Sequence, residues 1–251
     1  MQPTVISFLS ALLTCLMLAL SPLSAFANPE AVETGRLLAI LLDSGRVVVG
    51  ANQALINDKD KGDKGFTPDV FEKQLQAKFK ERSGVDLTNL GVASVPAQAK
   101  TLLPALVQAS KKTVADNQAT INKAGTGYKG FTPAHYGTQA AAQFSENTGV
   151  YLKQTTMDNL LRNPKNKADE YEAQTLKKFA EASYPRQGEK TISDVAPDGK
   201  SVRLLLPLFY GKACLSCHGG PKGETDISGY KKEGATEGDL GGAISVKVPL
   251  K

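Results

Sequence analysis

An ungapped internal duplication constrains the fold of this chain more than any other feature of its sequence. The two copies lie 65 positions apart and cover about residues 33–87 and 98–152. The clearest match is Lys64-Gly65-Phe66-Thr67-Pro68, which recurs unchanged as Lys129-Gly130-Phe131-Thr132-Pro133. Two copies are too few for a solenoid, so the duplication predicts one helical module that is made twice.

Each copy predicts a long amphipathic helix, a Gly-rich loop and a second helix. Apolar residues fall close to helical spacing in the first part of both copies, at Leu37, Leu38, Leu41, Val49 and Ile56, and again at Leu102, Leu103, Leu106, Val114 and Ile121. The second helix should begin after an N-cap threonine that precedes a proline, at Thr67 and Thr132. Gly84 and Gly149 should end it about four turns later.

The residues after the second copy have a different pattern. A helix is expected at 169–183, and strands are expected at 190–195, 201–210 and 242–250. The polar, Gly-rich stretch 219–241 should form a loop between the last two strands. The sequence therefore predicts an α+β fold with helices in front and a small antiparallel sheet behind.

The first 27 residues have the pattern of a secretory signal peptide. They carry a long apolar run and no charged side chain, and Ala25-Phe26-Ala27 is an A-x-A cleavage site before Asn28. Because no positive charge precedes the apolar run, an uncleaved N-terminal anchor is the alternative. Lipidation at Cys15 is a third interpretation, but apolar residues flank it and make a poor lipoprotein site. The expected organisation is a signal peptide over 1–27, a helical repeat over 28–97 and an α+β domain over 98–251.

Two of the three cysteines and one of the two histidines stand together in Cys214-Leu215-Ser216-Cys217-His218. This C-x-x-C-H spacing is typical of covalent c-type haem attachment. Each thiol can form a thioether to a porphyrin vinyl group, and the following histidine can bind the iron as the proximal ligand. The motif therefore predicts one covalent haem c, held by Cys214 and Cys217, with His218 on the iron.

A structural zinc site and a redox-active thiol pair are the alternatives for this motif. A zinc site wants four Cys or His ligands, and the mature chain adds only His135. A thioredoxin-like C-x-x-C would begin a helix in a βαβ unit, whereas this one follows a strand-like run and leads into a Gly-rich loop. Since haem c is attached outside the cytoplasm, the motif and the export signal together predict a periplasmic or otherwise exported protein.

Several further segments accompany the motif in a recognisable order: Arg162-Asn163-Pro164 with Asn166 and Glu172, then the strand before the motif, then Tyr230-Lys231-Lys232-Glu233-Gly234, and finally 238–246. In these features the chain resembles single-haem c-type domains with a PAS-like fold, long described as a domain of unknown function. They occur as free periplasmic proteins and as sensory modules of membrane histidine kinases. The resemblance covers roughly residue 102 to the C-terminus and implies a PAS-like haem c domain. The extra N-terminal copy departs from it.

His135 is the candidate for the second axial position of the iron. The second copy differs from the first at three positions within about two helical turns. The first copy has Val70, Glu72 and Leu75, and the second has His135, Gly137 and Ala140 in their places. The second copy thus gains a potential iron ligand and has smaller side chains beside it. With Ala141 and Ala142, this face should be flat enough to lie against a porphyrin. His135 lies near the N-terminus of its helix, where the positive end of the helix dipole favours the neutral imidazole, the form that binds iron. The resemblance implies a cysteine ligand from a helix at about this place, so the role requires a change of ligand type.

Each of these assignments has a structural alternative. His135 could be a helix-surface histidine, with the alanines reflecting helix propensity. Met157 is a second candidate ligand, but it lies in a polar stretch and is expected to be a packing residue. Arg162 is a candidate to pair with a haem propionate through its planar guanidinium, and a capping or surface role is its alternative.

The sequence predicts an exported monohaem c-type cytochrome that carries single electrons to a redox partner protein and is not an enzyme. Two imidazole ligands would leave no iron position for a substrate. The alternative is a haem-based sensor of redox state or of a small gas, which passes a conformational change to a partner. A net charge of +5, scattered lysines and no Trp give no reason to expect nucleic acid. Membrane association is expected only if the signal segment stays uncleaved, and the oligomeric state is left open.

Overall fold

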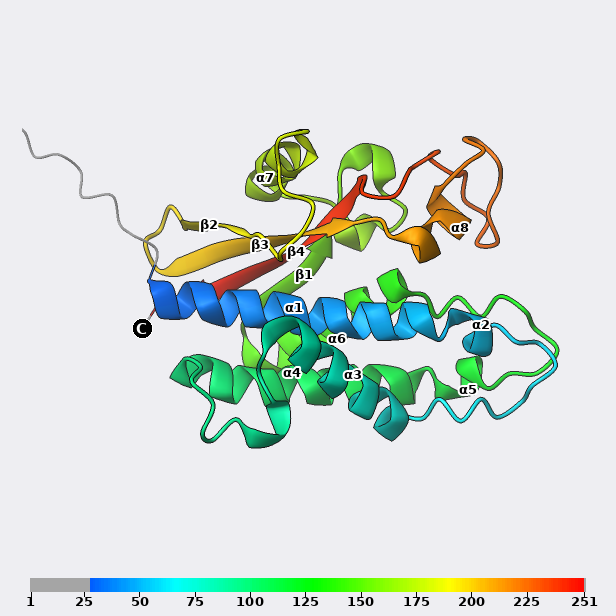
Figure 1. Cartoon of the computed structure of the whole chain (residues 1–251), viewed down its shortest axis with the longest axis horizontal. Helices are drawn as coiled ribbons and strands as arrows, with labels where there is room; N and C mark the ends of the chain where they lie inside the picture. The colour runs from blue at the N-terminus through cyan, green and yellow to red at the C-terminus, as the bar shows by residue number, and fades with distance from the viewer. Residues whose placement is uncertain (1–27, 251) are drawn as a thin grey trace, which may run out of the picture.

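The computed structural model describes residues 28–250, so the predicted signal peptide and Cys15 lie outside the described residues. Helix α7 (Glu170–Ala180) covers one face of a four-stranded sheet, and α1 (Pro29–Ala51) crosses the other face (Figure 1). The other long helices complete a helical layer with α1; they are α3 (Pro68–Ser83), α4 (Ala97–Asp116) and α6 (Pro133–Thr148). Within residues 28–250, no helix is long and apolar enough to cross a bilayer.

The sheet is antiparallel throughout, in the order β1-β4-β3-β2. Its strands are β1 (Tyr151–Thr155), β2 (Ile192–Val195), β3 (Ser201–Phe209) and β4 (Leu240–Pro249). Alternate residues of the two central strands face the helical layer, namely Val202, Leu204, Leu206, Ile244, Val246 and Val248. Leu205 and Ala243 point the other way and pack with α7. The predicted α+β class is confirmed.

Several bounds differ slightly from the prediction: α7 ends at Ala180 rather than at 183, β2 begins at Ile192 rather than at 190, and β4 begins at Leu240 rather than at 242. Two differences are larger. The strand β1 was not predicted, because its five residues mix polar and apolar side chains and it lies at the edge of the sheet, paired with β4 only. The first helix of each copy was predicted to continue to Ile56 and Ile121, but it ends earlier, at Ala51 and Asp116. The next residue is an asparagine in both copies, and Asn52 Nδ2 donates to the carbonyl of Val48 at 2.8 Å, which competes with regular helix bonding.

The predicted N-caps and C-caps of the second helices are confirmed. The hydroxyl of Thr67 accepts a hydrogen bond from the N–H of Val70, and that of Thr132 accepts one from the N–H of His135, both at 3.2 Å. Gly84 ends α3 in the left-handed region, with φ of 75°, and Gly149 ends α6 in the same way. Local chemistry therefore sets identical bounds for α3 and α6, 65 positions apart.

The two copies exchange equivalent contacts through their loops. The N–H of Lys64 donates to Oδ1 of Asn122, and the N–H of Lys129 donates to Oδ1 of Asn57, both at 3.1 Å. Lys129 and Asn122 are the counterparts of Lys64 and Asn57. A two-fold axis produces this pattern, so the copies are related by a pseudo-two-fold axis inside one chain.

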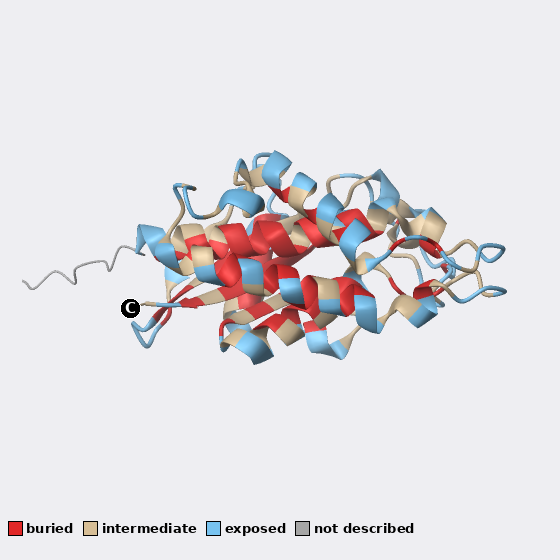
Figure 2. Ribbon diagram, turned by 90° about the horizontal axis from the view of Figure 1, so that it is seen from below, coloured by how far each residue is buried: buried red, intermediate tan, exposed pale blue. Residues whose placement is uncertain are grey.

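Helix α1 is buried on nearly all sides rather than amphipathic as predicted. Every residue from 37 to 42 has no exposed surface, because the sheet packs on one side of the helix and α3, α4 and α6 pack on the other. Figure 2 shows the buried residues concentrated along these helices. One hydrophobic core thus contains residues of both copies and of the central strands, and it is continuous across the boundary predicted at residue 97.

Candidate functional site

The C-x-x-C-H segment lies where β3 leaves the sheet. It forms the short helical turns η4 (Lys212–Cys214) and α8 (Leu215–His218). The N–H of Tyr210 donates to the carbonyl of Asp239 at 2.8 Å, which joins the exit of β3 to the residue before β4. The N–H of Ala235 donates to the carbonyl of His218 at 2.8 Å. The segment is therefore held by the end of the sheet on one side and by the following loop on the other.

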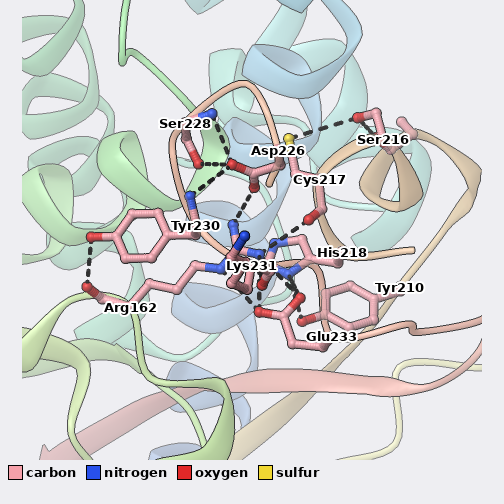
Figure 3. A network of polar contacts seen from close by, with 11 residues as sticks. Arg162, Tyr210, Ser216, Cys217, His218, Asp226, Ser228, Tyr230, Lys231 and Glu233 are labelled. Atoms are coloured by element: carbon pink, nitrogen blue, oxygen red, sulfur yellow. Dashed lines mark hydrogen bonds and ion pairs between the residues drawn. The ribbon is translucent and has the colours of Figure 1, made fainter. Parts of the chain in front are cut away.

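The imidazole of His218 is fixed by two neighbours (Figure 3). Its Nδ1 lies 2.9 Å from Oε2 of Glu233 and 3.2 Å from the hydroxyl of Tyr210. Its ring is stacked on the Tyr210 ring, with centroids 4.7 Å apart and planes 22° apart. Because a carboxylate accepts a hydrogen from Nδ1, the lone pair of a neutral ring lies on Nε2, which is then available to a metal. Burial, assisted by the charge of Arg162, lowers the pKa of His218, although Glu233 opposes the shift.

Arg162 connects this histidine to the loop. Its Nε and Nη2 donate to the two carboxylate oxygens of Glu233, each at 3.0 Å, and its Nη1 donates to Oδ2 of Asp226 at 2.7 Å. Nη2 also lies 3.1 Å from the carbonyl oxygen of Cys217. The structure thus brings Arg162 together with the motif, but its guanidinium contacts these protein oxygens. Its role toward a propionate stays a prediction.

Asp226 organises the loop that follows the motif. Its Oδ1 accepts from the N–H and the hydroxyl of Ser228, at 2.8 and 2.6 Å, and from the N–H of Tyr230 at 3.1 Å. Burial raises the pKa of Asp226, but the hydrogen bonds to Ser228 and Arg162 outweigh it and lower that pKa to about 2. The carboxylate is therefore ionised at neutral pH and well into the acid range.

The two cysteines of the motif are free thiols and half-buried. Cys214 ends η4, and Cys217 lies in α8 directly before His218, so the three residues stand on two consecutive short helical turns. The hydroxyl of Ser216 lies 3.8 Å from Sγ of Cys217. Over residues 28–250, no group of three or more His, Cys, Asp or Glu side chains could hold a metal ion by itself.

His135 lies apart from the motif, in the first turn of α6. It is exposed, and its Nε2 lies 2.8 Å from Nε2 of Gln139, one turn along the same helix. Its ring packs edge-on against Phe131, with centroids 6.0 Å apart. Desolvation lowers its pKa, which favours the neutral ring. Both side-chain contacts are with its own segment, so its role as a ligand stays a prediction.

The loop before α6 does reach the motif. Burial raises the pKa of Tyr128, and the nearby Cys217 and Asp226 raise it further, while Ser228 opposes the shift. Asp63 stands at the equivalent position of the first copy. The segment that carries His135 therefore lies beside the loop that follows Cys217 and His218.

The flat alanine face predicted for α6 is wrong. Ala140 and Ala141 are buried in the helical core, and Ala142 is exposed. Their small size serves helix packing. At Gly137 a Cβ atom would overlap Oε1 of Gln154 and lie 2.9 Å from Cδ of Arg46, so the missing side chain makes room for these two residues.

Met157 is partly buried and packs against the second hydrophobic cluster, which contains Leu176, Phe179 and Leu205. This is the packing role that the sequence favoured for it. Tyr210, Asp226 and Glu233 are the residues of the site to which sequence reasoning gave no role. Asp226, two residues before Ser228 and near Gly229, carried a turn signal, but nothing local indicates that Glu233 returns to His218.

Three comparisons with known proteins were made, and the match to a family model is the one that shows a relationship. A family model described as Tll0287-like matches residues 90–249, which include the second copy, the motif and all four strands. A solved structure titled "Crystal structure of the cyanobacterial heme-protein Tll0287" is 17% identical, with a TM-score of 0.42, and the match covers 63% of this chain and 98% of that chain. No curated protein matches the chain.

Proposed function

Because this chain belongs to the Tll0287-like family, we propose that it is a haem protein that carries single electrons through one covalently attached haem c. The observation that supports this most directly is the joint geometry of the motif. Two free thiols and a histidine share one turn, and a carboxylate holds Nδ1 of that histidine at 2.9 Å. A hydrogen-bonded carboxylate of this kind orients metal-ligating histidines in other sites.

The residues present fit this group. Cys214 and Cys217 would hold it, because each S–H can add across a vinyl C=C bond, with the sulfur going to one carbon and the hydrogen to the other. This addition consumes no oxidant or reductant. His218 would present Nε2 to the iron, since its Nδ1 is occupied by Glu233. A free pair of thiols, rather than a disulfide, is the form that this attachment requires.

When bound, haem c supplies a one-electron couple at iron, and the protein tunes it through ligands and surroundings. Glu233 accepts the Nδ1 hydrogen and makes His218 a stronger electron donor. Stacking on Tyr210 fixes the plane of the imidazole ring. Arg162 holds Glu233 in place with two parallel hydrogen bonds, so the carboxylate cannot turn away from the histidine.

Several finer assignments belong to the same proposal. His135 is the proposed second axial ligand, in an exported, periplasmic protein without enzymatic activity that passes electrons to a redox partner. The sheet with a helix on each face supports a PAS-like arrangement for the domain. The match to the family begins at residue 90, so residues 28–89 are proposed as a helical addition to it.

A haem-based sensor is the second candidate, and one observation favours it. The side chain of His135 contacts Gln139 and Phe131 of its own segment. If it stays there, an open iron position could bind a small gas and pass a change to a partner.

The absorption spectrum of the exported protein, oxidised and reduced, with and without carbon monoxide, separates these functions. A low-spin spectrum that does not change when carbon monoxide is added would support electron transfer. A reduced protein that binds carbon monoxide would favour the sensor. A protein whose denatured chain carries no haem would contradict both.

A further inference from the structure

We propose that the loop after the attachment motif carries a docking surface for an acidic redox partner protein. This ribbon surface consists of Ile227, Tyr230, Lys222 and Lys231, with the isoleucine at its centre. The inference rests on the proposed function, because it places the partner beside the haem that the motif would hold.

Residues 223–232 form a short two-stranded ribbon. Thr225 and Lys231 form an antiparallel bridge. The N–H of Asp226 donates to the carbonyl of Tyr230 at 2.8 Å and closes the tip, where the side chain of Asp226 also accepts hydrogen bonds from the turn. The backbone of the tip is therefore fixed, and its side chains are presented in defined positions.

Two large apolar side chains of the ribbon are exposed. Ile227 is 62% exposed and Tyr230 is 46% exposed. A single exposed apolar residue is common on protein surfaces and needs no explanation. Here two of them stand three residues apart on one ordered tip. Aromatic and aliphatic anchors surrounded by polar residues are typical of the centre of a protein interface.

Arg162 connects the ribbon directly to the motif. Its Nη2 donates to the carbonyl of Cys217 at 3.1 Å, and its Nη1 donates to Oδ2 of Asp226 at 2.7 Å. The guanidinium lies over the ring of Tyr230, 5.1 Å from its centroid, and the Tyr230 hydroxyl donates to the carbonyl of Arg162 at 3.0 Å (Figure 3). A partner that binds on Tyr230 would therefore lie close to the proposed haem, as electron transfer requires.

The exposed charges of the ribbon are mainly positive. Lys222 and Lys231 are exposed, and Nζ of Lys231 donates to the hydroxyl of Thr225 at 2.7 Å rather than to a carboxylate. Lys232 pairs with Glu224 at 2.7 Å, so these two residues add no net charge. Two lysines beside two exposed apolar side chains fit a partner whose apolar contact area is bordered by carboxylates.

The other acidic groups of the loop are turned inward or lie beyond the ribbon. The carboxylate of Asp226 is fully buried and that of Glu233 is 18% exposed, and both pair with Arg162. Glu237 and Asp239 are exposed, but they follow the ribbon and precede β4. Repulsion of an acidic partner is therefore weak at the ribbon. A surface of this size suits a transient complex, since interfaces that transfer electrons are among the smallest between proteins.

The test uses the exported, haem-loaded protein and reduced plant-type ferredoxin as the probe. This ferredoxin is an acidic one-electron protein, and its potential of about −400 mV makes it a strong reductant. One electron passes from its iron–sulfur cluster to the oxidised haem, so the cluster is oxidised and the iron is reduced. Stopped-flow absorption measures the second-order rate constant at several ionic strengths. In the wild type the rate should fall as salt is added, because salt screens an attraction.

Ile227→Ser tests the apolar centre of the surface. The rate constant should fall at least about fivefold, because truncation of a central anchor weakens a protein interface. Its dependence on ionic strength should stay as in the wild type. Val92→Ser is the matched control, since Val92 is 79% exposed in the segment between the two copies. This control should keep the wild-type rate.

Lys222→Glu combined with Lys231→Glu tests the charges. The rate constant should fall roughly tenfold at low ionic strength, and added salt should no longer slow the reaction. Lys177→Glu combined with Lys178→Glu changes the net charge equally, but on exposed residues of α7. This control should stay much closer to the wild-type rate, because the attraction is local to the ribbon.

Rate constants of the Ile227 variant and of the ribbon lysine variant that equal those of their controls would overturn the proposal. A changed haem spectrum in Ile227→Ser would also overturn it, because the cofactor itself would then cover this side chain. A wild-type dimer in sedimentation that Ile227→Ser dissociates would do the same, because the occupant would be a second copy. A wild-type protein without haem would instead contradict the proposed function, which makes the two failures distinguishable.

Discussion

Nδ1 of His218 and Oε2 of Glu233 lie 2.9 Å apart, although 15 residues of chain separate them. The carboxylate of Glu233 also accepts two hydrogen bonds from Arg162, and these bonds fix the orientation of the carboxylate relative to His218. A carboxylate in this position makes the imidazole a stronger donor and stabilises the more positive oxidation state of a metal bound to Nε2.

Replacing Glu233 with Gln should raise the reduction potential, since the charge that stabilises the oxidised state is removed while the shape is kept. Loss of a charge-assisted hydrogen bond of roughly 1.5 kcal/mol corresponds to a rise of about 60 mV for a one-electron couple. Spectroelectrochemical titration measures this shift. Glu237→Gln, on an exposed residue of the same loop, is the control and should leave the potential unchanged. Equal potentials in the two variants would contradict the role of Glu233.

Replacing Cys214 and Cys217 together with Ala should leave no covalently bound haem, because both thioethers are lost. Haem staining of a denaturing gel, with mass spectrometry of the intact chain, checks this. Ser216→Ala lies between the two cysteines and should retain haem. Haem that survives denaturation of the double variant would disprove attachment at these residues.

Replacing His135 with Ala should convert a low-spin spectrum into a high-spin one that binds carbon monoxide, because the proposed sixth ligand is lost. Val70→His places a histidine at the equivalent position of the first copy, and it should not change the spectrum. Absorption spectra of both reduced variants with carbon monoxide are sufficient. A spectrum of His135→Ala that equals the wild type would remove His135 from the iron.

Asp226 should make stability depend on pH in the acid range. Its pKa is lowered to about 2 in the folded protein, against about 3.9 in an unfolded chain. Its contribution is therefore fully present above about pH 4 and is lost as the pH falls through about 2. At neutral pH, Asp226→Asn should lower the free energy of unfolding by about 2 kcal/mol, and the difference from wild type should shrink as the pH falls toward 2. Denaturant unfolding measures it, with the exposed Asp60→Asn as the control.

Gly45 and Gly50 should respond in opposite ways to alanine. A Cβ atom at Gly45 would overlap the ring and hydroxyl of Tyr136, which is fully buried and donates to Ser110 at 2.8 Å. We expect Gly45→Ala to lower the free energy of unfolding by about 1–3 kcal/mol, despite its better helix propensity. At Gly50 the nearest atom is Cγ of Pro133 at 3.4 Å, so Gly50→Ala should be neutral or stabilising. Denaturant unfolding curves of the two variants decide; a stable Gly45→Ala protein would contradict the packing at this helix crossing.

Features that depend on neighbouring residues could be predicted from the sequence. Thr67 and Thr132 cap their helices because the hydrogen bond spans three residues, and the C-x-x-C-H motif is contiguous. Features that depend on distant contacts could not be predicted. The edge strand β1 exists because β4 pairs with it, and Glu233 matters because the loop brings it back to His218. Gly137 was interpreted as room for a cofactor, whereas it accommodates Arg46 and Gln154 of other elements.

The reciprocal hydrogen bonds between Lys64 and Asn122 and between Lys129 and Asn57 join two modules that one polypeptide connects. Separate subunits meeting through such an interface would dissociate on dilution, and their stability would depend on protein concentration. Here the linker keeps each module at a high effective concentration for the other, so association is unimolecular. Dilution therefore cannot separate the two modules, and their sequences are free to diverge, as Gly137 and Ala134 of the second copy do from Glu72 and Asp69 of the first.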